Sequence, residues 1–431
     1  MKEYEINQKG NFCVGGADVT ELAEKYGTPL YVYDENVIRS SIRAFKKSME
    51  ENYDGNGMVL YASKAFSCKE IYRIAQSEGI GADVVSAGEL YTALSAGFLP
   101  ENIFFHGNNK TQEEIEFAVK NNVGCFVVDN ISELELLNTI ALQHNKKVRI
   151  MFRIKPGIDA HTHDFIRTGQ IDSKFGFALE TGEAKQAVLQ ALSGEYPAVE
   201  LIGLHCHIGS QIFEVEPFCL AAEVMLDFMI EIKNETGVSL GELNLGGGFG
   251  IKYTQEDSPR PYGEYMGSVS EAIKLKCSAA GFSIPKIYIE PGRSIAANAG
   301  TTIYKVGAVK NIPNIRTYVS IDGGMVDNPR YILYRSKYDL LIANKALQPK
   351  SEVVTVAGKC CESGDLIQEN VKLQPVEVGD ILAVTATGAY NYSMASNYNR
   401  ICRPAAVMVK DGQARLIIKR ETFEDLVRND V

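Results

Sequence analysis

The sequence predicts an α/β fold in which a closed (β/α)8 barrel of the TIM type is followed by a C-terminal all-β domain. Between residues 58 and 294, short β-branched or aromatic runs alternate with amphipathic runs. Eight such strands, each followed by a helix over roughly 250 residues, match a closed barrel. After about residue 296 the strands follow one another without intervening helices, which is typical of a separate β domain.

The eight predicted barrel strands are short and mostly apolar, and they cover residues 58–63, 82–86, 103–107, 125–129, 148–154, 201–208, 242–246 and 287–290. The segments between them have helical spacing. In the sixth segment the apolar residues follow one helix face and are expected in the core: Ala221, Val224, Met225, Phe228, Met229 and Ile232. An open doubly wound sheet is the alternative, because periodicity alone does not prove that a sheet closes.

A further strand at 30–34 and a helix at 35–51 precede the barrel and could cap or join it. The stretch around 12–14 lacks partners of its own and is expected to pair with the β domain. The strands predicted for that domain cover residues 302–306, 317–321, 353–357, 381–385, 405–410 and 414–419. The predicted division is therefore an N-terminal segment at 1–34 that pairs with the β domain, a barrel at 35–295 and the β domain at 296–431.

Composition excludes several classes of protein. The 431 residues are 45% hydrophobic and 23% charged, with a net charge of -10, which is ordinary for a globular protein. No Lys/Arg run could follow a phosphate backbone, so nucleic acid is not expected as a partner. No signal peptide and no stretch of about 18 apolar residues is found, which indicates a cytoplasmic protein without a membrane partner. The nine scattered cysteines fit a reducing compartment.

The carboxyl ends of the predicted strands carry the candidate chemistry, because barrel enzymes place their active sites at this end. The first strand ends at Lys64, the sixth at residues 205–210, the seventh at 246–250 and the eighth at 290–293. A lysine at the end of an apolar strand is partly desolvated, and its neutral amine can attack an aldehyde to form a Schiff base. The alternative is an exposed lysine that begins the next helix.

The other strand ends suit a flat, anionic cofactor. The glycine-rich turn at 246–250 lets backbone N–H groups approach an anion, and the next helix could add its N-terminal dipole; the alternative is a simple tight turn. Glu290 could keep a cofactor ring nitrogen protonated or pair with Arg293. His205 and His207 point to the same face of their strand, where an imidazole could stack on a planar ring.

Metal binding is the competing hypothesis for the histidines. His161 and His163, like His205 and His207, have the H-x-H spacing of metal ligands. Metal-dependent barrel hydrolases would also require an aspartate at the last strand end, where this chain has Glu290 followed by Pro, Gly and Arg. The pattern therefore favours an anion and ring-nitrogen site, and no metal is predicted.

With these residues in place, the chain resembles the fold-type III pyridoxal-phosphate decarboxylases, the alanine racemase and ornithine decarboxylase-like enzymes, and within them the diaminopimelate decarboxylase family. The resemblance covers nearly the whole chain. It rests on motifs at residues 61–65, 83–90, 168–176, 205–211, 246–250, 290–294, 330–334, 361–365, 388–390 and 393–399. The segment after Arg330 lacks a proline that is common in the family, which leaves the i, i+4 pair of Arg330 and Tyr334 intact.

The resemblance implies roles for individual residues. Lys64 holds pyridoxal 5'-phosphate as an imine, His207 stacks on its ring and Glu290 pairs with the ring nitrogen. The cofactor-binding residues implied in all are Lys64, Asp83, His207, Ser210, Gly247, Glu290, Pro291, Gly292, Arg293 and Tyr390, with the phosphate held by Ser210, Gly247, the 292–293 turn and Tyr390. The substrate-binding residues implied are Arg293, Arg330, Tyr334, Glu362 and Tyr390.

The resemblance also implies a homodimer in which Cys361 and Glu362 reach the partner's active site. Glu362 recognises the distal ammonium group of a small amino-acid substrate, and Cys361 or Lys64 returns the final proton. The implied reaction is the decarboxylation of meso-2,6-diaminopimelate to L-lysine and carbon dioxide, the last step of lysine biosynthesis. Cys361 could instead be a structural thiol, since Cys360 lies beside it.

Two alternative functions stay open from the sequence. A related decarboxylase acting on a basic amino acid or carboxynorspermidine would keep Lys64, His207 and Glu290 and change the residues at the far end of the substrate. Arg330 with Glu362 favours a substrate with both an amine and a carboxylate there. A non-catalytic homologue that only binds the coenzyme would be expected to lose Cys361, Glu362 and Tyr390, which this chain retains.

Overall fold

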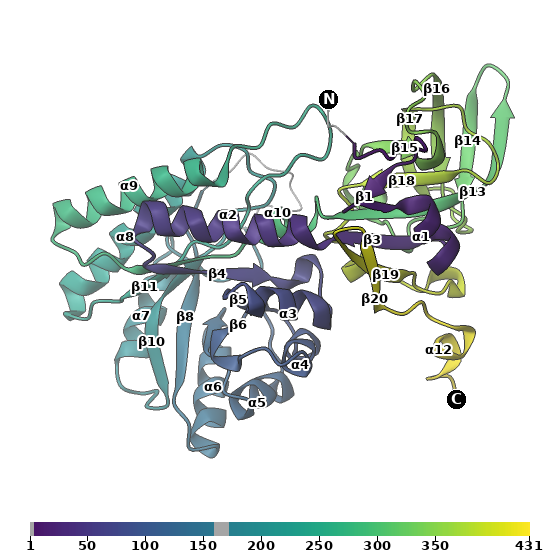
Figure 1. The fold of residues 1–431 in the computed structure, drawn as a ribbon. Coiled ribbons are helices and arrows are strands. Elements are labelled where there is room, and N and C mark those ends of the chain that lie inside the picture. The colour runs from purple at the N-terminus through teal and green to yellow at the C-terminus, as the bar shows by residue number, and fades with distance from the viewer. Residues whose placement is uncertain (1–3, 159–171) are drawn as a thin grey trace. The chain divides into compact units, whose positions relative to one another are not determined.

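The computed structural model describes residues 4–158 and 172–431, which form two compact units. One unit comprises Ser41–Gly250 and Pro259–Gly292. The other comprises Met1–Ser40, Ile251–Ser258 and Arg293–Val431. In Figure 1 the first unit is a ring of strands surrounded by helices, and the second is built mainly of strands. No helix in the described part of the chain is long and apolar enough to cross a membrane.

Eight parallel strands form the closed barrel of the first unit. They are β4 (Gly57–Ala62), β5 (Gly81–Val84), β6 (Ile103–Phe105), β7 (Cys125–Val128), β8 (Val148–Lys155), β10 (Val199–Cys206), β11 (Glu242–Asn244) and β12 (Lys286–Ile289). Each pairs with its neighbours in the ring, and the β8–β10 pair closes it. All eight predicted strands are confirmed, and closure rules out the open sheet. A short strand that was not predicted, β9 (Phe177–Ala178), pairs with β8.

Helices follow the barrel strands in chain order and cover the ring (Figure 1). They are α3 (Lys69–Ser77), α4 (Ala87–Ser95), α5 (Gln112–Lys120), α6 (Ile131–Gln143), α7 (Glu183–Leu192), α8 (Glu216–Thr236) and α9 (Tyr262–Ala280). Helices α4, α5 and α6 begin at side-chain caps, such as Ser86 before α4, whose oxygen accepts from the Glu89 N–H. In α8 the predicted apolar face is buried except at Val224, which is half-exposed because it lies at the edge of that face.

The second unit contains a sheet in the order β17-β16-β14-β13-β3-β19-β20. Its strands are β3 (Leu30–Asp34), β13 (Gly300–Ile312), β14 (Arg316–Ile321), β16 (Glu352–Ala357), β17 (Leu366–Leu373), β19 (Ala405–Lys410) and β20 (Gln413–Ile418). Two more, β15 (Leu340–Ile342) and β18 (Ile381–Thr385), pair with each other, and β18 also pairs with β13. The predicted strands are all present, while β15 and β17 were missed.

The N-terminal segment belongs to this sheet. Strand β3 lies between β13 and β19, so the hypothesis that it joins the barrel is wrong. Its residues Leu30–Tyr33 are fully buried, because β3 is an internal strand with hydrogen-bonded neighbours on both sides, whereas the closed ring of the barrel leaves no free edge for another strand. The remaining strands and α-helices of the described residues are β1 (Cys13–Val14), β2 (Ala17–Asp18), α1 (Val19–Tyr26), α2 (Glu35–Tyr53), α10 (Arg293–Ala296), α11 (Arg330–Tyr334) and α12 (Phe423–Val427).

Gly203 provides a test of the barrel packing. A Cβ at this position of β10 would lie 2.0 Å from the backbone oxygen of Glu242, so strands β10 and β11 would have to separate. We expect Gly203→Ala to lower the free energy of unfolding by about 1–3 kcal/mol, measured by urea denaturation. The matched control is Gly241→Ala, since a Cβ at Gly241 meets no atom within 4 Å. Equal midpoints for the two variants would contradict this packing.

Candidate active site

The inward face of the barrel changes from apolar to polar near the carboxyl ends of the strands. An apolar cluster fills the interior and includes Leu60, Phe104, Cys125, Val127, Met151 and Tyr288. Side chains two positions apart on a strand share a face. Phe104 is therefore followed on the same face by His106, and Tyr288 by Glu290. The sequence thus places a polar layer directly above the apolar one, at the end of the barrel where TIM-type enzymes act.

Glu290 is the centre of this polar layer and is only 6% exposed. Its Oε1 accepts a hydrogen bond from Asn244 Nδ2 at 2.7 Å and lies 2.9 Å from His106 Nε2. Its Oε2 lies 3.3 Å from His205 Nε2. Asn244 is fixed in turn, because its Oδ1 accepts from the Gly246 N–H at 2.9 Å. Three neighbouring groups therefore hold both oxygens of a buried carboxylate.

Electrostatics keep this carboxylate ionised. Burial alone would raise the pKa of Glu290, but His106 and His205 outweigh burial and hold the pKa well below its usual value. Burial lowers the pKa of His205 to about 4, so His205 is neutral near pH 7. The barrel interior thus contains an anion positioned to meet a positively charged group.

Asp83 is a second buried acid on the same side of the barrel. It lies on β5, is 1% exposed, and its Oδ1 has no hydrogen-bond partner within the described residues. Burial raises the pKa of Asp83, while the charges of His106 and Lys64 act in the opposite direction. An unpartnered buried carboxylate oxygen indicates that a ligand or water completes its contacts.

Lys64 lies in a single turn, η1 (Ser63–Ala65), directly after β4. Ser63 holds the turn: it is fully buried, and its Oγ donates to the backbone oxygen of Asp83 at 2.6 Å and lies 3.0 Å from Glu89 Oε2. Glu89 also accepts from the Val85 N–H at 2.8 Å. The amine is thereby presented from a rigid turn and not from the exposed start of a helix, which was the alternative.

His207 follows the end of β10 and contacts the glycine turn. Its Nδ1 accepts a hydrogen bond from the Gly247 N–H at 3.2 Å, which places the proton of the neutral ring on Nε2. Burial, and after it the charge of Lys64, holds the pKa of His207 well below its usual value. His207 is therefore a neutral, half-buried ring, which suits stacking on an aromatic cofactor.

The glycine turn packs tightly against the end of β12. A Cβ at Gly247 would lie 2.2 Å from the backbone oxygen of Glu290, so only glycine allows this approach. The expectation that a helix dipole follows the turn is wrong, because α9 begins only at Tyr262. The chain instead enters the segment Ile251–Ser258 of the other unit.

Among the described residues, one cluster of possible metal ligands bears on the metal hypothesis. The ligand atoms of His106, His205 and Glu290 lie within 4.8 Å of one another, and this group includes only one member of the 205–207 pair. Both carboxylate oxygens of Glu290 already contact the two histidines directly. His161 and His163 lie outside the described residues.

In the second unit, four of the predicted substrate residues lie together. The guanidinium carbon of Arg293 lies 4.7 Å from the centre of the Tyr390 ring. That of Arg330 lies 5.6 Å from the Tyr334 ring and 6.0 Å from the Tyr390 ring. Asn391 anchors the turn that carries Tyr390, because its Nδ2 donates to the Thr387 oxygen at 2.9 Å. Both arginines are buried, which is unusual for cations without a ligand.

Cys361 and Glu362 are both exposed in the loop between β16 and β17. The Cys361 N–H donates to Asn399 Oδ1 at 2.7 Å, and the Tyr398 hydroxyl donates to the Cys361 oxygen at 3.3 Å. Hydrogen bonds thus join two of the motifs on which the resemblance rests, those at 361–365 and 393–399.

Asp365 joins this loop to the loop that precedes Arg330. Its carboxylate accepts from the Cys360 N–H at 2.8 Å and from the Met325 N–H at 2.6 Å. It packs against Gly324 and Gly358, where a Cβ would lie 2.5 Å and 2.1 Å from its oxygens. One buried side chain therefore fixes two loops with predicted substrate residues.

Four residues of these clusters were not predicted from the sequence. His106 and Asn244 lie near the ends of the strands predicted at 103–107 and 242–246, so the rule that directed attention to strand ends could have found them. Arg153 also lies on a barrel strand, and the charges of Asp129, Glu290 and Asp83 act on it. Tyr253 lies in a loop and outside every motif, so no sequence signal indicated it.

The fold and the barrel cluster define a pyridoxal-dependent enzyme. A family model described as "Pyridoxal-dependent decarboxylase, pyridoxal binding domain" matches residues 36–297. Diaminopimelate decarboxylases of Bacillus methanolicus and Bacillus subtilis (strain 168) are 50% and 49% identical, over 96% and 99% of this chain and 96% of each relative.

Solved structures give the same result. A diaminopimelate decarboxylase from M. jannaschii in complex with L-lysine has a TM-score of 0.92 and 38% identity, covering 100% of this chain and 98% of that one. The enzyme from Helicobacter pylori, also complexed with L-lysine, has a TM-score of 0.85 and 33% identity over 95% and 98% of the two chains. The chain belongs to the diaminopimelate decarboxylase family of pyridoxal-dependent decarboxylases.

Asp327, in the loop before Arg330, gives a prediction about pH. It is buried, accepts from the Tyr304 hydroxyl and from the Gly324 N–H, and burial raises its pKa to about 7. The folded protein thus holds this proton more tightly than the unfolded chain, whose aspartates titrate near ~3.9. Its contribution to stability is present at low pH and is lost as the pH rises from about 4 to about 7.

We expect Asp327→Asn to reduce this decline of the unfolding free energy, by up to about 1.4 kcal/mol per pH unit, in urea titrations at several pH values across the window. The exposed Asp54→Asn should keep the wild-type dependence. A variant with the wild-type slope would show that Asp327 is ionised throughout.

Proposed function

We propose that this protein decarboxylates meso-2,6-diaminopimelate to L-lysine and carbon dioxide with pyridoxal 5'-phosphate, as the last step of lysine biosynthesis. The observation that carries the proposal is the identity of about half of all residues, over the whole chain, to diaminopimelate decarboxylases. The retained Cys361, Glu362 and Tyr390 support a catalyst over a protein that only binds the coenzyme. The absence of a membrane-spanning helix in the described residues supports a cytoplasmic location.

The barrel residues fit the cofactor. Lys64 would attach it, the ionised Glu290 would hold a proton at its ring nitrogen, and the neutral His207 would stack on the ring. The unpartnered Oδ1 of Asp83 supports a further contact. Ser210, Gly247, Pro291, Gly292, Arg293 and Tyr390 would complete its binding, chiefly at the phosphate. When bound, pyridoxal phosphate supplies a conjugated ring that accepts the electron pair left by departing carbon dioxide.

Glu290 contributes through its charge. Because His106, His205 and Asn244 fix both oxygens, the carboxylate needs no rearrangement to stabilise a positive ring nitrogen. A carboxylate in water would lose much of this effect to solvent, whereas here the site is buried. With the cofactor bound, Glu290 would favour the protonated ring, the form that withdraws electrons most strongly.

The remaining roles concern the substrate. Arg293, Arg330, Tyr334 and Tyr390 would bind a substrate carboxylate, since guanidinium groups match its two oxygens. Glu362 would bind the distal ammonium group, and Cys361 or Lys64 would return the proton after carbon dioxide leaves. The exposure of Cys361 and Glu362 supports a homodimer in which they serve the partner's site.

The substrate test is direct. Purified protein supplied with pyridoxal phosphate is expected to release carbon dioxide from meso-diaminopimelate and to yield L-lysine, measured by coupled assay and mass spectrometry. L-ornithine and L-lysine are the controls, because they lack a carboxylate at the far end. Release from either control, with none from diaminopimelate, would refute the proposed substrate.

Glu290→Gln tests the ring-nitrogen role. The amide keeps the shape but cannot balance a positive charge, so we expect kcat/KM for diaminopimelate to fall by about 10²–10³-fold. Glu242→Gln is the matched control, since Glu242 lies at the opposite, amino end of β11 and contacts Arg149 and Tyr288. Activity of Glu290→Gln within twofold of the wild type would rule this role out.

A further inference from the structure

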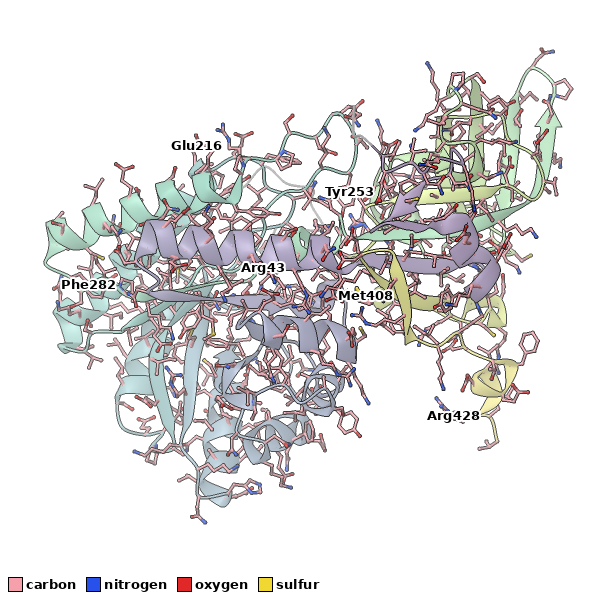
Figure 2. The ribbon with its side chains drawn as sticks, in the orientation of Figure 1. Arg43, Glu216, Tyr253, Phe282, Met408 and Arg428 are labelled. Carbon is pink, nitrogen blue, oxygen red and sulfur yellow. The ribbon has the colours of Figure 1, made fainter. Side chains whose placement is uncertain are left out.

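Tyr253 lies in the segment Ile251–Ser258, which follows the glycine turn and belongs to the unit with the β sheet. Figure 2 labels this residue. The segment is irregular but is held firmly: the N–H groups of Tyr253 and Thr254 both donate to Asp257 Oδ2, at 3.0 Å and 2.8 Å. The backbone of Tyr253 is therefore fixed without a helix or strand.

The side chain of Tyr253 is fixed as well. It is only 7% exposed. Arg293 Nη1 donates a hydrogen bond to its hydroxyl oxygen at 2.5 Å, and the guanidinium carbon of Arg330 lies 5.2 Å from the centre of its ring. Tyr338 packs edge-on against the ring, with centroids 5.6 Å apart. One tyrosine thus contacts both arginines, one through its oxygen and one through its ring face.

Arg330 has the features of a side chain that binds an anionic ligand. It is 6% exposed, and its Nη2 donates to Ser336 Oγ at 3.0 Å. Its Nε is buried without a hydrogen-bond partner, and no carboxylate of the described residues forms an ion pair with it. A buried guanidinium in this condition is costly unless a ligand supplies negative charge.

Tyr253 reduces that cost while no ligand is bound. Its oxygen is an acceptor for Arg293, and its electron-rich ring face attracts the Arg330 cation. Burial would raise the pKa of the Tyr253 phenol, but the two arginines outweigh burial and lower the pKa. The hydroxyl oxygen and the ring face of Tyr253 therefore offer electron density to the two cations, and the two contacts hold the guanidinium groups at fixed positions.

We propose that Tyr253 is a specificity-determining positioning residue: it holds the guanidinium groups of Arg293 and Arg330 in the arrangement that binds the carboxylate of the substrate. The proposal rests on the proposed function and adds to it a residue that selects amino acids with a carboxylate at the end remote from the reacting amine. Without the Tyr253 hydroxyl, Arg293 loses the hydrogen bond that orients its Nη1.

The test compares two ligands that differ in this carboxylate alone. L-Lysine and cadaverine share the chain and both amines, and only L-lysine has the carboxylate. Isothermal titration calorimetry on the cofactor-loaded protein would give both affinities. We expect Tyr253→Phe to weaken L-lysine binding about tenfold, as for one lost hydrogen bond to a charged group, and to leave cadaverine within twofold. Asp257→Ala, which frees the segment but keeps the tyrosine, should act in the same direction.

The control is Tyr331→Phe, because Tyr331 lies on the same short helix as Arg330 but donates to Glu369. It should leave both affinities unchanged. Equal weakening of both ligands by Tyr253→Phe, or unchanged L-lysine affinity, would overturn the proposal. If the wild type itself does not prefer L-lysine to cadaverine, the proposed function fails and the inference fails with it; a wild-type preference that is unchanged in size in Tyr253→Phe overturns the inference alone.

Discussion

The ionised carboxylate of Glu290 inside the barrel is the constraint on which the rest of the site depends. A lone buried carboxylate would take up a proton, because the interior stabilises charge poorly. Here His106 and His205 lie within 2.9 Å and 3.3 Å of its oxygens and Asn244 donates at 2.7 Å. Each of these groups lies on or directly after a different barrel strand, so the carboxylate stays ionised only while the barrel is closed.

The second unit buries cations, whereas the barrel buries an anion. Burial would lower the pKa of Arg330, but the surrounding phenols of Tyr253, Tyr334, Tyr338 and Tyr390 outweigh burial and raise it. Aromatic rings stabilise a cation through their faces without becoming full anions, so a carboxylate ligand can still bind. A glutamate in the same place would neutralise the arginine and compete with the substrate.

The sequence predicted the barrel well because each strand repeats one simple pattern. Eight short apolar runs separated by amphipathic helices are local signals, and all eight strands are present with boundaries that differ by a few residues. The polar ends of those strands identified Lys64, His207 and Glu290 for the same reason. The β domain was harder to predict, since β15 and β17 are short or polar and are specified by their partners in the sheet.

By itself, therefore, the sequence determined the fold class, the strand order within the barrel and the chemical types at the strand ends, because these depend on periodicity along the chain. Only the tertiary structure decided which groups meet: His106 with Glu290, Asp365 with two loops, and Tyr253 with two arginines. The pairs His106–Glu290, Tyr253–Arg293 and Met325–Asp365 are 184, 40 and 40 positions apart in the chain. Their formation depends on strand register and loop packing, and no local pattern in the sequence encodes either.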